Sequence, residues 1–116
     1  MKVLVVGSNF FLDEFKDYFE TREFEAFFAK TIVDAMEILA KNKVKYVIIA
    51  INSMSDVILL KYLNKNHKDI QVILMANKQF TNFLSILKES EFNVINNPFR
   101  FTEISEIINK SSKGEQ

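Results

Sequence analysis

The sequence predicts one three-layer α/β domain, in which five parallel strands form a doubly wound sheet between two layers of helices. Its 116 residues are enough for a single hydrophobic core. Short apolar runs alternate along the chain with segments of helical periodicity. Because these runs are apolar at successive positions, both faces of each strand should be covered by helices, as in a parallel sheet with right-handed crossovers.

Five segments are predicted to be strands because each is a short, nearly continuous apolar run bounded by polar or turn residues. They are residues 3–6, 24–29, 46–51, 70–76 and 92–95. Ligands of doubly wound folds bind beyond the carboxyl ends of the strands. The loops that matter most therefore follow Val6, Ala29, Ile51, Ala76 and Ile95.

The first two helices are predicted from a capping residue followed by regularly spaced apolar residues. Ser8 or Asn9 can cap the first helix, in which phenylalanines recur at four-residue spacing from Phe11 to Phe19. Thr31 and Asp34 resemble a capping box with aspartate in place of the usual glutamate or glutamine. A second helix should therefore begin just after Thr31.

Three more helices complete the predicted pattern. Ser55 or Asp56 is expected to cap the third helix, and Phe80 with Phe83 marks the fourth. Thr102 is expected to cap the last helix, which should close a domain spanning residues 1–110. Residues 111–116 contain no apolar side chain and are predicted to be a disordered tail or the start of a linker.

Composition excludes several classes of function. Fifteen basic and fifteen acidic residues cancel, so no long-range attraction to nucleic acid or to an anionic membrane is expected. The chain has no cysteine, which excludes disulfides, thiolate nucleophiles and thiolate metal sites. No apolar stretch approaches the length of a signal-peptide core or a membrane span, so we expect a cytoplasmic protein.

The remaining polar candidates have ordinary interpretations. Asp56 is better explained as a helix cap than as a catalytic acid, and His67 as a solvated loop residue. The lysines at 41, 43 and 45 are expected to be solvated at a helix end. Because no pair of titratable groups converges on the strand ends, the chain is expected not to be an enzyme.

Four segments carry a resemblance to a known family. They are KVLVV near the start, AKTIVDAMEILAKNKVKYVIIA through the third strand, QVILMAN at the fourth, and VINNPF at the end of the fifth. Their order and spacing resemble the receiver domain of response regulators, the flavodoxin-like module of two-component signalling, over about residues 2–110. The resemblance implies a (βα)5 fold of the flavodoxin-like type.

The residues that carry the family's chemistry are absent at the matching positions. In the family, two acidic residues after the first strand hold Mg²⁺, and an aspartate ending the third strand accepts phosphate. A hydroxyl after the fourth strand and a lysine after the fifth bind the phosphoryl group. The matching positions here are Gly7, Ser8, Asn9, Ala50, Ala76 and Asn97. The resemblance therefore implies a degenerate pseudo-receiver with no metal, no cofactor and a small, neutral pocket.

Family resemblance also suggests where such a module would act. Receivers use the fourth helix, fifth strand and fifth helix for dimerisation and output, so we expect an apolar contact surface at Phe80, Phe83, Leu87 and Phe101. The plainer alternative is that most of these side chains fill the core. We expect a phosphorylation-independent module of bacterial signal transduction or transcriptional regulation that binds a protein partner or forms a homodimer. The alternative is a domain that senses a small ligand in the vacated pocket.

Overall fold

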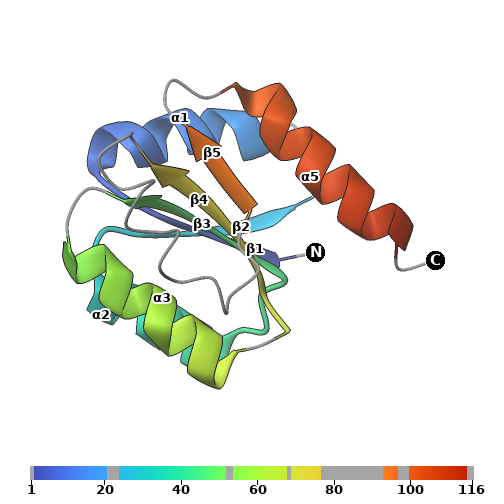
Figure 1. The fold of residues 1–116 in the computed structure, drawn as a ribbon. Helices are drawn as coiled ribbons and strands as arrows, with labels where there is room; N and C mark the ends of the chain where they lie inside the picture. Colours follow the sequence, from blue (N-terminus) through green and yellow to red (C-terminus); the bar gives the residue numbers. More distant parts are fainter. Residues whose placement is uncertain are drawn as a thin grey trace.

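The computed structural model describes residues 2–20, 24–51, 54–67, 69–76, 93–96 and 100–114 of the chain. Its strands form one parallel sheet in the order β2-β1-β3-β4-β5 (Figure 1). The strands are β1 (Lys2–Val6), β2 (Glu25–Ala29), β3 (Tyr46–Ile51), β4 (Gln71–Ala76) and β5 (Asn93–Asn96). The helices are α1 (Asn9–Glu20), α2 (Ile32–Lys41), α3 (Met54–Asn66) and α5 (Phe101–Gly114). The predicted α/β class and parallel sheet are confirmed.

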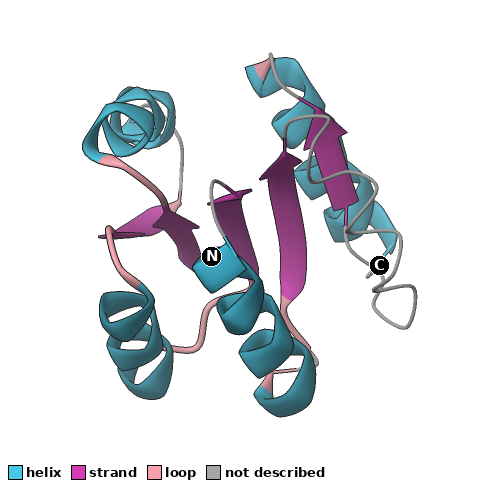
Figure 2. Cartoon of the chain, turned by 60° about the vertical axis from the view of Figure 1, so that its left-hand side comes forward, coloured by secondary structure: helices cyan, strands magenta, loops and turns pink. Residues whose placement is uncertain are grey.

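Helices cover both faces of the sheet, with α1 and α5 on one side and α2 and α3 on the other (Figures 1 and 2). Successive side chains of β3 point into opposite layers. Tyr46 and Ile48 pack beneath α1 and α5, whereas Val47 and Ile49 pack beneath α2 and α3. All four are fully buried, which explains why this strand is a continuous apolar run.

The layer of α1 and α5 is built from aromatic rings. Phe15 is fully buried and contacts the ring of Phe101 at a centroid distance of 5.2 Å. The Tyr18 ring stacks on Phe101 at 4.6 Å, and its hydroxyl is hydrogen-bonded to the hydroxyl of Ser105. These contacts fix α5 against α1, so the last helix is part of the core packing.

Two predicted helix starts are confirmed. The hydroxyl of Thr31 accepts a hydrogen bond from the Asp34 amide at 3.1 Å, the first half of the predicted capping box. Helix α1 begins at Asn9, and the carbonyl of Ser8 accepts its first helical bond, from the Leu12 amide at 2.9 Å. Ser8 is therefore the residue that precedes the helix.

The other two helix starts that the structure describes were predicted wrongly. Helix α3 begins at Met54, which places Ser55 and Asp56 inside the first turn. Helix α5 begins at Phe101, so Thr102 is not its cap. The carboxylate of Glu103 instead accepts a bond from the Arg100 amide at 3.1 Å. A carboxylate in the first turn of a helix stabilises the positive end of the helix dipole, as a terminal cap would.

The last helix extends past residue 110, where the sequence placed the end of the domain, and the domain bounds themselves stay a prediction. Helix α5 continues to Gly114, through four residues that the sequence assigned to the tail. The predicted fourth helix, with Phe80 and Phe83, lies outside the described residues, so the full (βα)5 count stays a prediction. Within the described part of the chain, no helix is both long enough and apolar enough to cross a membrane.

Candidate functional site

Three central strands end side by side at one edge of the sheet. Ala50 on β3 is paired with Met75, and Ile51 is paired with Ala76, the last residue of β4. On the other side, Val6 of β1 is level with Ile49, so the next residue, Gly7, lies beside Ala50. The sheet therefore brings together three of the positions that the sequence singled out, at Gly7, Ala50 and Ala76.

The remaining predicted positions are only partly described. Ser8 is exposed at the start of α1, and Asn9 is the first residue of that helix. Asn97 lies outside the described residues, although Asn96, which precedes it, is paired with Ala76 at the end of β5. The carboxyl ends of the described strands thus lie together at one edge of the sheet, which is where doubly wound folds bind their ligands.

The three converging residues carry no functional group. By sequence, the side chains of Ala50 and Ala76 are methyl groups, and Gly7 has no side chain. Acyl-phosphate formation requires a carboxylate, and Mg²⁺ requires several oxygen ligands. In the described part of the chain, no three aspartate, glutamate or histidine side chains are grouped so that they could hold a metal ion. These residues supply neither a nucleophile nor a charge for phosphoryl transfer.

The space beside Gly7 is occupied by an aromatic ring. A β-carbon on Gly7 would lie 2.5 Å from Cδ2 of Phe11 and 3.1 Å from its Cγ. Phe11 is itself half-buried and packs on the Phe15 ring with centroids 4.8 Å apart. The ring thus fills the volume into which a side chain at position 7 would project. This contact was missed from the sequence, although the four-residue spacing from 7 to 11 was available as a signal.

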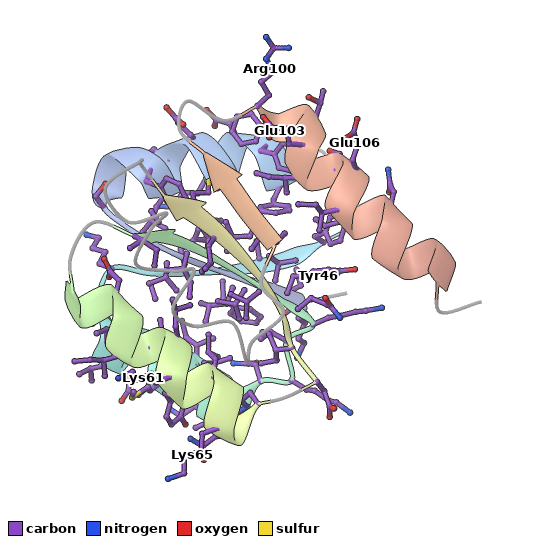
Figure 3. The ribbon with its side chains drawn as sticks, viewed as in Figure 1. Tyr46, Lys61, Lys65, Arg100, Glu103 and Glu106 are labelled. Atoms are coloured by element: carbon purple, nitrogen blue, oxygen red, sulfur yellow. The ribbon has the colours of Figure 1, made fainter. Side chains whose placement is uncertain are left out.

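The predicted interaction surface is described at one residue only. Phe80, Phe83 and Leu87 lie outside the described residues. The ring of Phe101 is half-buried and directed toward α1, against Phe15 and Tyr18. Charged side chains lie along α5 and just before it: Arg100 and Glu106 are exposed, and Glu103 is half-buried (Figure 3).

The other polar candidates also have assigned places. Asp56 is half-buried in the first turn of α3, where a negative charge stabilises the helix. His67 follows the end of that helix and packs near Tyr62, with ring centroids 5.4 Å apart. His67 lies at the edge of the sheet opposite Ala50, whereas Asp56 lies at the start of α3, on the side of the sheet where β3 ends.

Among the comparisons with known proteins, only the comparison with solved structures finds matches. No protein-family model matches it, and no curated protein matches it. It is similar to a response-regulator receiver domain from Clostridium thermocellum, with 20% identity, a TM-score of 0.86, and coverage of 98% of this chain and 95% of that one.

Two further structures have the same architecture. The receiver domain of a Francisella response regulator is 24% identical, with a TM-score of 0.80 and coverage of 99% and 98% of the two chains. A Thermotoga maritima response regulator, solved in complex with Mg²⁺ and BeF, is 20% identical with a TM-score of 0.78, over 94% and 96%. The chain therefore has the fold of a response-regulator receiver domain.

Proposed function

We propose that this chain is a receiver-like module of bacterial signal transduction or transcriptional regulation that works without phosphorylation. In this proposal it acts by contact with a protein partner or with a second copy of itself. The observation that carries the proposal is that Gly7, Ala50 and Ala76 meet at one edge of the sheet. Resemblance to receiver domains assigns these positions to the phosphorylation site, and none of the three residues has the chemistry for it.

The chemistry of phosphoryl transfer supports this interpretation. A phosphoacceptor must supply a nucleophilic oxygen, and the methyl group of Ala50 has none. Mg²⁺ binding by neutral oxygens such as that of Ser8 would be very weak, because the ion favours carboxylates and phosphates. The Thermotoga protein was solved with Mg²⁺ and BeF, whereas the matching edge here contains glycine and alanine.

The position of Phe11 favours protein contact over a small-ligand sensor in the vacated pocket. Its ring takes the space beside Gly7 that a ligand would need. Opening that space would separate Phe11 from Phe15, whose rings pack at 4.8 Å. A ligand would have to offset the loss of this buried aromatic contact before it gained any affinity.

The direct test is incubation of the protein with Mg²⁺ and acetyl phosphate, followed by intact mass spectrometry. We expect no covalent phosphate, with a receiver domain that retains its aspartate as the positive control. A stoichiometric gain of one phosphoryl group would contradict the proposal.

The second test is the solution mass over a range of concentrations, measured by light scattering during size-exclusion chromatography. If a dimer forms, the charge reversal Glu106→Lys on α5 should weaken it. The matched control is Glu37→Lys, a reversal at an exposed residue on α2. A monomer at all concentrations would assign the function to contact with a different protein. For residues outside the described part, Phe80→Ser and Phe83→Ser test the predicted apolar surface.

A further inference from the structure

A hollow of about 570 Å³ lies at the edge of the sheet opposite Ala50. It opens where α2 ends at Lys41 and α3 ends at Asn66. The loops that lead from these helices into β3 and β4 complete its wall. The hollow is therefore separate from the strand edge at which receiver chemistry would take place.

The base of the hollow is apolar and firmly packed. Leu39 and Val44 belong to the core beneath α2 and α3, with 6% and 4% of their surfaces exposed. Ile70 is half-buried against the same core. These side chains give the hollow a fixed hydrophobic floor that could cover the apolar part of a small molecule.

The rim of the hollow is basic. Among the described residues, Lys41, Lys43 and Lys65 line it, against one carboxylate, that of Asp69. All four are exposed, and none forms an ion pair with another described residue. In a chain of zero formal net charge, this is a local excess of positive charge contributed by segments far apart in the sequence.

Helix stability accounts for only part of this charge. Lys41 and Lys65 lie in the last turns of α2 and α3, where cations stabilise the helix dipole. Lys43 lies beyond the end of α2, in the loop to β3, so the dipole does not explain its presence.

One carbonyl near the end of each helix is already satisfied by another donor. The backbone and side-chain nitrogens of Asn42 donate to the Ile38 carbonyl at 2.9 and 3.1 Å. Asn66 Nδ2 donates to the Tyr62 carbonyl at 3.1 Å. These carbonyls do not require the lysine ammonium groups, which leaves the ammonium groups available to a ligand.

We propose that this hollow binds a small organic anion, in which a phosphate or carboxylate meets the lysine rim and an apolar group covers the floor. Its volume lies within the range of about 300–1,000 Å³ that is typical of small-molecule sites. An extended acidic protein segment would use the rim but would gain little from the floor, so the combination favours a small molecule.

The probes for the test are phenyl phosphate and inorganic phosphate, which share the anionic group and differ in the apolar ring. Each is titrated into ¹⁵N-labelled protein at low ionic strength and followed by NMR. We expect saturable shifts at the amides of Asn42, Lys43 and His67, with tighter binding of phenyl phosphate. Equal affinities for phenyl phosphate and inorganic phosphate would show that the apolar floor does not contribute to binding. Chemical shifts that do not saturate would show that the hollow is not a binding site.

Lysine variants test which positive charges contribute to anion binding. Lys43→Gln combined with Lys65→Gln should weaken phenyl phosphate binding by about five-fold or more, given the energies of exposed ion pairs. The matched control is Lys61→Gln, an exposed lysine one turn before Lys65 on α3 that does not line the hollow (Figure 3). A similar loss in the control would show that only general charge attraction is involved and would overturn the proposal.

A hexaglutamate peptide tests the competing occupant. We expect it to bind more weakly than phenyl phosphate and to be displaced by it. If the peptide binds more tightly, at the same amides and with the same dependence on Lys43 and Lys65, the hollow is a protein-docking site and the small-molecule proposal fails. Binding of either probe should weaken as salt is raised, because the lysines are exposed to solvent.

Discussion

The aromatic ring of Phe11 lies against the α-carbon of Gly7, with its Cδ2 atom 2.5 Å from the place a β-carbon would occupy. Real β-carbons do not tolerate so close a neighbour, so the two positions constrain each other. While Phe11 keeps this rotamer, only glycine fits at position 7. An acidic side chain at position 7 and the ring of Phe11 in this rotamer would therefore occupy the same space, so the structure can contain only one of them.

Substitution of Gly7 by alanine should destabilise the fold. The added methyl group must displace the Phe11 ring from its contact with Phe15, and overpacking of this kind typically costs about 1–3 kcal/mol. The free energy of unfolding from urea denaturation, monitored by circular dichroism, measures the effect. A Gly7→Ala variant as stable as the parent would show that the ring moves aside freely.

A double-mutant cycle assigns that cost to the ring. Phe11→Ala removes the obstruction, so Gly7→Ala should cost far less in a Phe11→Ala background than in the parent. The coupling is expected to be of the order of 1 kcal/mol or more. An unchanged cost in both backgrounds would mean that the strain at position 7 comes from the backbone and not from Phe11.

An aspartate at position 50, where the resemblance to receivers places the phosphoacceptor, should not by itself allow phosphorylation and should lower stability. Ala50 is half-buried at the end of an apolar strand, and a poorly solvated carboxylate there should cost about 1–3 kcal/mol. The cost arises in the ionised form, so it should shrink as the pH is lowered toward about 4. Thermal melting of Ala50→Asp at two pH values measures it, with Ala50→Asn as the neutral control. A melting temperature that is unchanged or raised at neutral pH would refute this prediction.

The strands were predictable from the sequence because burial on both faces dictates their composition. Each observed strand begins and ends within one residue of its predicted range, and β3 has exactly the predicted range. Helix starts were harder to predict, because several polar residues near one boundary compete to cap it. At α5 the Arg100 amide donates to the carboxylate of Glu103, which lies inside the helix, whereas the sequence pattern favoured Thr102 as the preceding cap.

The candidate site was predictable only in its position. The limits of the apolar runs placed Gly7, Ala50 and Ala76 at or beside strand ends, and the parallel sheet brings them together. The ring of Phe11 beside Gly7 depends on a side-chain rotamer, which no periodicity specifies. The basic hollow escaped prediction for a different reason: Lys65 joins Lys43 only through the packing of α2 beside α3.

The cap of α2 gives a local test of the fold. Thr31→Ala removes the hydroxyl that accepts the Asp34 amide and should lower the free energy of unfolding by about 0.5–2 kcal/mol. Thr31→Ser keeps the acceptor and should remain close to the parent. If both variants lose the same stability, the methyl group of Thr31 matters and the hydrogen bond does not.

The link between the sheet and the last helix gives a test in the core. Tyr46 is fully buried on β3, and its hydroxyl donates to the carbonyl of Ile108 on α5 at 3.3 Å. Tyr46→Phe keeps the ring and removes the bond, so it should cost about 0.5–1.5 kcal/mol. The substitution should also speed amide hydrogen exchange more in α5 than in α2, because only α5 loses a hydrogen bond to the sheet. The control is Tyr62→Phe, a half-buried tyrosine on the opposite face whose hydroxyl has no partner within the described residues. Equal effects of the two substitutions, or faster exchange throughout the protein, would show that Tyr46 acts by packing alone.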